Sequence, residues 1–132
     1  MEQKDKELLL KDLCARLPYK CKYKALKKIT HWHKLTLNTR TIDKIIDDYY
    51  DEIKPYLRPM SSMTEEEKWE YTNLCFEEDR EAFVFGEWAT KTYYHDTIES
   101  IDWLNKNHFD YRGLIEKGLA IEVTEENNPY KE

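Results

Sequence analysis

The feature that most constrains the fold is a change of hydrophobic period at Pro18. Up to that residue, apolar side chains including Leu9, Leu10 and Leu13 recur on one face of a helix, which a proline then stops. After it, lysines occupy every second position of residues 20–24, with aromatic or small apolar residues between them. The alternation returns at residues 33–38, where Leu35 and Leu37 share one side. We therefore expect a helix over 4–16 and a strand pair over 19–26 and 33–38.

The rest of the chain mixes both periods. Thr64 and Glu67 form a capping-box pattern that predicts a helix over 65–77 fraying in the charged run 77–81, and Asp96 with Glu99 predicts another over 97–107. The apolar spacing from Ile42 predicts a helix over 41–53, which Pro55 ends. The remaining elements are a proline-bracketed extended connector at 54–60, strands at 82–85 and 88–94 broken at Gly86, a short helical piece at 114–117 and a strand at 119–123.

These elements predict an α+β fold, a small antiparallel sheet packed with three to four helices. At 132 residues the chain is the length of one domain. We expect that domain to span residues 1–123 and to be followed by a loose polar tail at 124–132. The expected buried side chains are Leu10, Leu13, Leu35, Leu37, Ile98, Ile101, Leu104 and Leu114.

The net charge of −6 conceals an asymmetry. Residues 1–60 carry a net charge of +5 and residues 61–132 a net charge of −11. Eight basic residues and no acidic residue lie between Leu13 and Ile42, with Tyr19, Tyr23 and Trp32 among them. This pattern is compatible with a surface that binds phosphates and stacks bases. The alternative is that the lysines keep a sheet edge soluble.

Few residues indicate catalytic chemistry. His31 and His33 would share one face of a strand and could be metal ligands, but a third ligand is not defined, and the alternative is a solvent-facing pair. The three cysteines lack ligand or disulfide spacing, which favours reduced thiols in a cytoplasmic protein. No nucleophile elbow, phosphate loop or zinc-protease motif is present in the sequence, so we expect a non-enzymatic protein without a cofactor. No stretch is long and apolar enough to span a membrane, and we expect no membrane partner.

Three stretches resemble a known group of sequences: LLLKDLCARLPY at 8–19, IKPYLRPMSSMTEEEK at 53–68 and DWLNKNHFDYRGLIEKGLAIE at 102–122. They are similar to short uncharacterised proteins encoded in gut Bacteroidales genomes and in their phages and prophages. The resemblance implies a phage or mobile-element setting and no particular activity. Members of the group usually have a glycine after Leu-Pro-Tyr, where this chain has Lys20, and residues 20–52 are divergent and basic.

We interpret the chain as a small binding protein that acts on a host or phage protein. The first alternative is a nucleic-acid-binding accessory protein that uses the basic segment 20–40, and the second is a metal-dependent or hydrolytic enzyme. A further hypothesis is a pocket formed by Tyr56, Arg58, His108, Tyr111 and Arg112. The simpler explanation is a turn in which Arg112 pairs with Asp110 or with a helix C-terminus. The candidate binding residues are Lys20, Lys22, Lys24, Lys27, Lys28, Trp32, Tyr56, Arg58, Tyr111 and Arg112.

Overall fold

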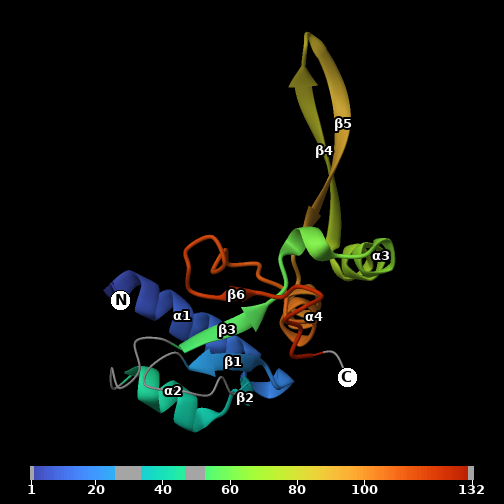
Figure 1. Ribbon diagram of the computed structural model, residues 1–132. Coiled ribbons are helices and arrows are strands. Elements are labelled where there is room, and N and C mark those ends of the chain that lie inside the picture. The colour runs from blue at the N-terminus through green and yellow to red at the C-terminus, as the bar shows by residue number, and fades with distance from the viewer. Residues whose placement is uncertain (1, 26–33, 47–52, 131–132) are drawn as a thin grey trace. The chain divides into compact units, whose positions relative to one another are not determined.

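The computed structural model describes residues 2–25, 34–46 and 53–130 and confirms an α+β fold (Figure 1). Internal contacts divide the chain into two compact units. Unit 1 combines Met1–Ser62 with Asn105–Glu132, and unit 2 is the continuous stretch Met63–Leu104. The sequence patterns did not indicate this division.

Unit 1 is built on a four-stranded sheet with the order β2-β1-β3-β6. Strand β1 (Lys22–Ala25) runs antiparallel to both β2 (Lys34–Thr36) and β3 (Ile53–Leu57), whereas β6 (Ile121–Glu122) runs parallel to β3. Helix α1 (Gln3–Arg16) precedes the sheet, a 3-10 turn (Leu17–Tyr19) follows the helix, and α2 (Thr39–Ile46) contacts α1 (Figure 1). The predicted first helix and strand pair are confirmed.

The core of unit 1 lies between α1 and the sheet. Leu9 and Leu13 of the helix are fully buried in one cluster with Cys21, Tyr23 and Leu57. Burial of these apolar side chains is the main favourable contribution to folding of this unit. The alternation expected of β1 is confirmed, because the cysteine and tyrosine are buried while the neighbouring lysines are partly exposed.

The expected core is mostly confirmed. Leu13, Leu37, Leu104 and Leu114 are buried, and Leu10 and Ile101 are half-buried. The prediction that Ile98 is buried is wrong, because this residue lies in the first turn of α4 (Ile98–Lys106) and is 79 % exposed. The side chain of Leu35 lies outside the described part of the chain.

The helix expected over 41–53 and the connector expected over 54–60 are corrected. Helix α2 is described as far as Ile46, residues 47–52 lie outside the described ranges, and Ile53 already begins β3. Pro55 is paired with Tyr23 inside the sheet rather than in a connector. Its neighbours explain this, since Ile53, Tyr56 and Leu57 are all buried. The free energy gained by their burial outweighs the cost of the hydrogen bond that proline, without an N–H donor, cannot make.

Unit 2 contains two helices and a long hairpin. Helix α3 (Glu65–Leu74) has the predicted capping box, in which Thr64 Oγ1 accepts from Glu67 N at 3.1 Å and Glu67 Oε1 accepts from Thr64 N at 3.0 Å. Strands β4 (Phe76–Val84) and β5 (Glu87–His95) pair along their whole length. The strands expected at 82–85 and 88–94 therefore exist, but the run 77–81 is part of β4 and not a frayed helix end.

The cap of α4 also differs from expectation. Thr97 Oγ1 accepts from Ser100 N at 3.0 Å, and Ser100 Oγ accepts from Thr97 N at 2.7 Å. Thr97 is thus the capping residue in place of Asp96, which instead accepts hydrogen bonds from side chains of both helices of unit 2. The piece expected to be helical at 114–117 is a turn, and β6 confirms the strand expected at 119–123.

The segment expected to be a loose tail is attached to the sheet at Tyr130, although its first residues, 124–126, are exposed. The Tyr130 hydroxyl accepts from Lys22 N at 2.9 Å and donates to Tyr56 O at 2.7 Å. These backbone groups lie one position beyond the last β1–β3 pair, Tyr23 with Pro55, so the hydroxyl joins the two strands there. The Tyr130 ring stacks on His108 with 3.7 Å between the ring centroids. A polar composition therefore did not predict disorder here.

None of the helices among the described residues combines the length and apolar character needed to cross a bilayer.

Removing the Tyr130 hydroxyl should destabilise the protein. In Tyr130→Phe, Lys22 N and Tyr56 O lose their shared partner inside the fold, which should lower the free energy of unfolding by about 1–3 kcal/mol. Urea denaturation measures this change. Tyr94→Phe, which changes an exposed tyrosine of β5, is the matched control and should stay within about 0.5 kcal/mol of the parent. Equal midpoints for the two variants would contradict the bridging role.

Candidate functional site

The basic residues predicted to bind polyanions are only partly described. Lys20 is exposed and has a left-handed backbone with φ of 55°. Lys22 and Lys24 project from the partly exposed face of β1, where Lys22 Nζ donates to Thr36 Oγ1 and Lys24 lies opposite Lys54 of β3. The other predicted residues on this segment lie outside the described ranges: Lys27, Lys28, Trp32 and the metal-ligand candidates His31 and His33.

The predicted residues from the other two stretches are mostly used by the fold. Tyr56 is buried, and its carbonyl accepts the Tyr130 hydroxyl. The guanidinium of Arg58 lies 4.1 Å from the centre of the Phe109 ring. The Tyr111 hydroxyl donates to Asn105 Oδ1 at 2.9 Å and accepts from Arg112 Nη2 at 3.1 Å. These residues therefore make contacts within unit 1, Tyr56 through its backbone carbonyl and the others through their side chains.

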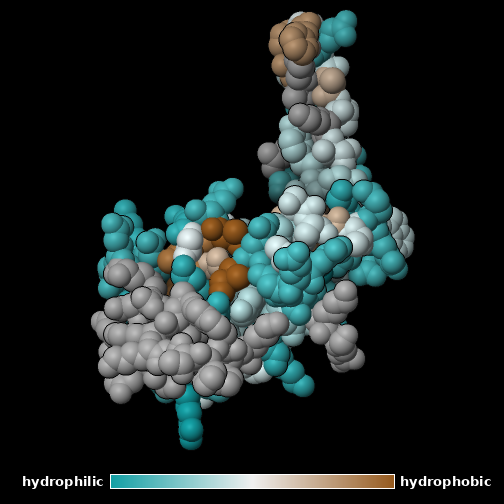
Figure 2. Space-filling view, viewed as in Figure 1, coloured by the Kyte–Doolittle hydropathy of each residue, from teal (hydrophilic) through white to brown (hydrophobic). Residues whose placement is uncertain are grey.

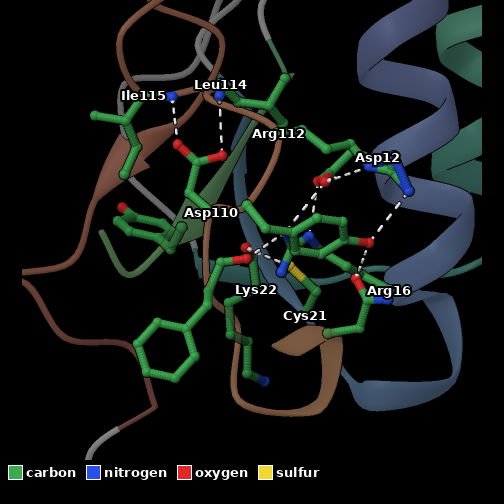
Figure 3. Close-up of polar contacts among 12 residues, drawn as sticks. Asp12, Arg16, Cys21, Lys22, Asp110, Arg112, Leu114 and Ile115 are labelled. Atoms are coloured by element: carbon green, nitrogen blue, oxygen red, sulfur yellow. Dashed lines mark hydrogen bonds and ion pairs between the residues drawn. The ribbon is translucent and has the colours of Figure 1, made fainter. Parts of the chain in front are cut away.

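The turn hypothesis gave Arg112 either Asp110 or a helix C-terminus as its partner, and the pairing with Asp110 is not observed. Arg112 pairs with Asp12 of α1, with 3.3 Å between Nε and Oδ1 (Figure 3). The Asp110 carboxylate instead accepts from Leu114 N and Ile115 N, both at 2.9 Å, and so fixes the turn that follows it (Figure 3). The sequence spacing favoured the local partner, but the fold brings a residue 100 positions earlier to Arg112.

Asp12 and Arg16 form a completely buried ion pair on α1. Arg16 Nε donates to Asp12 Oδ2 at 2.7 Å and Arg16 Nη2 donates to Asp12 Oδ1 at 3.1 Å (Figure 3). Arg16 Nη2 also donates to the carbonyl of Phe109. Burial, with Arg16 and Arg58 nearby, lowers the pKa of His108 to about 4, so that this imidazole is neutral at pH 7. These groups fasten the helix to the segment around Phe109, which is a structural role.

A pocket of about 500 Å³ lies beside this cluster in unit 1. Pro59, Met60, Asp110, Tyr111 and Ile115 are among its lining residues. Of the predicted binding residues, only Tyr111 lines it, and the Asp110 carboxylate is occupied by backbone N–H groups. The pocket therefore does not bring together the site that the sequence suggested.

The β4–β5 hairpin of unit 2 carries several large exposed apolar side chains, as do the helices α3 and α4 with Trp69 and Ile98. Phe83 is 61 % exposed, Phe85 101 % and Trp88 72 %, and Figure 2 shows the apolar residues gathered at the end of the hairpin. Phe83 and Trp88 are cross-strand partners in edge-to-face contact, with 5.6 Å between the ring centroids. We call Phe83, Phe85 and Trp88 the aromatic tip. The sequence predicts these strands but no site on them, although the aromatic residues beside Gly86 are a visible signal.

The turn at the aromatic tip is conformationally demanding. Phe85 and Gly86 alone connect the strands, and both have positive φ, 52° and 83°. Two-residue turns with two such residues match the twist of a hairpin, but their first position favours asparagine, aspartate or glycine. A phenylalanine there is strained by about 1 kcal/mol or more, and the fully exposed ring makes no compensating contact.

The base of the hairpin is held by a polar cluster within unit 2. The Tyr71 hydroxyl of α3 donates to Asp96 Oδ1, and Ser100 Oγ of α4 donates to the same oxygen at 3.1 Å. Thr97 Oγ1 donates to Leu74 O at 2.6 Å. Burial and the adjacent Asp96 carboxylate raise the pKa of Tyr71, which keeps its hydroxyl protonated as a donor. Helices α3 and α4 thereby hold the start of β4 and the end of β5 together at the base of the hairpin.

Within the described ranges, no three His, Cys, Asp or Glu side chains converge in a way that could hold a metal ion. Comparison of the whole chain with protein-family models, with curated proteins and with solved structures gives no match.

Replacing the strained residue of the turn should stabilise the hairpin. Phe85→Asn puts a residue that tolerates positive φ at a position where the ring makes no contact, and should stabilise the hairpin by about 1 kcal/mol. Slower hydrogen exchange of the β4 and β5 amides reports this change. Phe83→Asn is the control, since it removes an aromatic ring from a strand position and should speed exchange. Faster exchange in Phe85→Asn would contradict the strain assigned to this turn.

Proposed function

We propose that this protein is a small non-enzymatic binding protein that acts on another protein through the aromatic tip of its β4–β5 hairpin. The supporting observation is the fully exposed Phe85 at a backbone conformation that phenylalanine disfavours. Strain of this kind persists where function requires a residue that stability would replace. Phe85 contributes no packing to the chain itself, so its contribution is expected in a complex.

The chemistry of the tip supports a protein partner. Two phenylalanines and a tryptophan supply large rigid apolar surfaces, and aromatic residues are enriched among the residues that dominate protein–protein binding energy. A hairpin also presents these rings at the end of two nine-residue strands, where a partner pocket can enclose them. The resemblance to proteins of gut Bacteroidales and their phages supports a host or phage protein as the partner.

Photo-crosslinking tests this proposal. A benzoyl-phenylalanine at position 85, incubated with an extract of a gut Bacteroidales strain, should attach to one discrete protein, whereas the same group at the exposed position 73 on α3 should not. The captured protein is then identified, purified and titrated against the parent chain. Trp88→Ala should weaken that binding by about 30-fold or more, as expected for an interface anchor. Equal binding by the parent and Trp88→Ala would refute the proposal.

Nucleic-acid binding is the second candidate, and one observation favours it. Lys24 and Lys54 lie directly opposite each other on neighbouring strands, with Lys22 on the same strand as Lys24. Like charges placed this way repel, and a bound phosphate would relieve the repulsion. Against it, Lys22 Nζ is already engaged with Thr36, and the whole chain carries a net charge of −6.

We expect no micromolar binding of the parent protein to a single-stranded oligonucleotide, even at low salt. The measurement is fluorescence anisotropy, with the double variant Lys22→Glu and Lys24→Glu as the comparison. Should the parent bind, each phosphate contact would contribute roughly one unit of slope to the salt dependence of the affinity. A salt-sensitive complex that the double variant loses would show that Lys22 and Lys24 belong to the functional surface.

A further inference from the structure

The two faces of the hairpin differ in charge. The pairing of β4 with β5 puts alternate residues on opposite faces of the hairpin. Two side-chain contacts lie on the same face: Phe83 contacts Trp88, and Thr92 Oγ1 donates to Asp79 Oδ1 at 2.7 Å. We call this face the acidic face. It consists of Glu77, Asp79, Glu81, Phe83, Trp88, Thr90, Thr92 and Tyr94.

The acidic face carries three carboxylates and no basic residue. Every one of its side chains is exposed. The alternate positions of the same strands, which belong to the opposite face, carry charges of both signs. Glu78 and Glu87 are acidic, and Arg80 and Lys91 are basic. The imbalance therefore belongs to one face of the hairpin and is not a property of both.

The whole of unit 2 is strongly acidic. It has twelve acidic and three basic residues, a net charge of −9, whereas unit 1 has a net charge of +3. A negative field of this size attracts basic surfaces and repels acidic ones during encounter. The acidic face adds a local pattern to that field, because carboxylates two residues apart on a strand repeat about every 6.8 Å.

We infer that the protein bound by the aromatic tip is basic, and that the acidic face contacts an extended segment of that partner with Lys or Arg at alternate positions. This inference rests on the proposed function and adds the chemistry of the partner. The aromatic tip supplies apolar anchors. The carboxylates of Glu77, Asp79 and Glu81, between the tip and the base of the hairpin, select the charge and orientation of the partner segment. Cations spaced two residues apart on an extended chain repeat at the same distance as the carboxylates.

Defined peptides test this inference without the natural partner. The probes are two synthetic peptides of about 16 residues, one alternating Lys with Thr and the other alternating Glu with Thr. Backbone amide resonances of the ¹⁵N-labelled full chain are followed during titration with each peptide. The Lys peptide should shift the resonances of Trp88, Thr90 and Thr92, and the Glu peptide should not. Raising the salt from about 50 to 300 mM should weaken the Lys complex about tenfold.

A matched pair of variants separates the face from net charge. Asp79→Asn with Glu81→Gln removes two charges from the acidic face, and Glu78→Gln with Glu87→Gln removes two from the opposite face. The first variant should lose at least about fivefold in affinity for the Lys peptide, and the second should stay within about twofold of the parent. Equal losses, or shifts confined to residues outside the hairpin, would overturn the inference.

Two further outcomes keep this inference distinct from the proposed function. If the crosslinked partner loses affinity for Trp88→Ala but binds the two charge variants equally and without salt dependence, the inference fails while the proposed function stands. If the hairpin resonances shift with protein concentration in the absence of peptide, the face is occupied by a second copy of the chain, and the inference of a basic partner also fails.

Discussion

Unit 1 depends on the buried ion pair between Asp12 and Arg16. Two charges removed from water on one helix are favourable only where their remaining hydrogen-bonding groups are also satisfied. Here Arg112 reaches the carboxylate and the Phe109 carbonyl accepts from Arg16 Nη2, whereas Arg16 Nη1 is buried without a hydrogen-bond partner among the described residues. The segment around Phe109 is in turn bonded to Arg58, which directly follows β3: Arg58 N donates to His108 O at 2.7 Å, and Asp110 N donates to Arg58 O at 2.8 Å. Helix, sheet and late segment are thus fixed by one set of polar contacts.

Local patterns predicted most of the elements but not the long-range ones. The capping box at Thr64, the alternation in β1 and the helix before Pro18 are determined by neighbours in sequence, so their prediction succeeded. The sequence predicts that Pro55 ends a helix and belongs to a connector, whereas the burial of its neighbours puts it in β3. Likewise, the polar residues around Tyr130 predict a loose tail. The contacts of Tyr130 could not be predicted locally, because the strands that its hydroxyl joins are more than 70 positions away.

The candidate site was missed for a related reason. The sequence predicts binding at basic residues and metal binding at histidines because the chemistry of each such residue is recognisable without its neighbours. The aromatic residues of 83–88 were assigned to strands, where aromatics usually become buried. Only the structure shows that, apart from the half-buried Glu78, every described side chain of the hairpin is exposed. An isolated two-stranded sheet is marginally stable in water, so the polar cluster at Asp96 that anchors its base has particular importance.

The division of unit 1 into two stretches of chain has a consequence for folding during synthesis. Unit 2 is continuous, so its hairpin and helices can form as soon as Lys106, the last residue of α4, has left the ribosome. Arg16 must wait for a carbonyl 93 residues later, and Lys22 for a hydroxyl 108 residues later. Helix α1 is therefore synthesised first, but its contacts with the segment around Phe109 form only after that segment has been synthesised. Until then its two buried charges remain hydrated, and the part that emerges in the middle is the first to be complete.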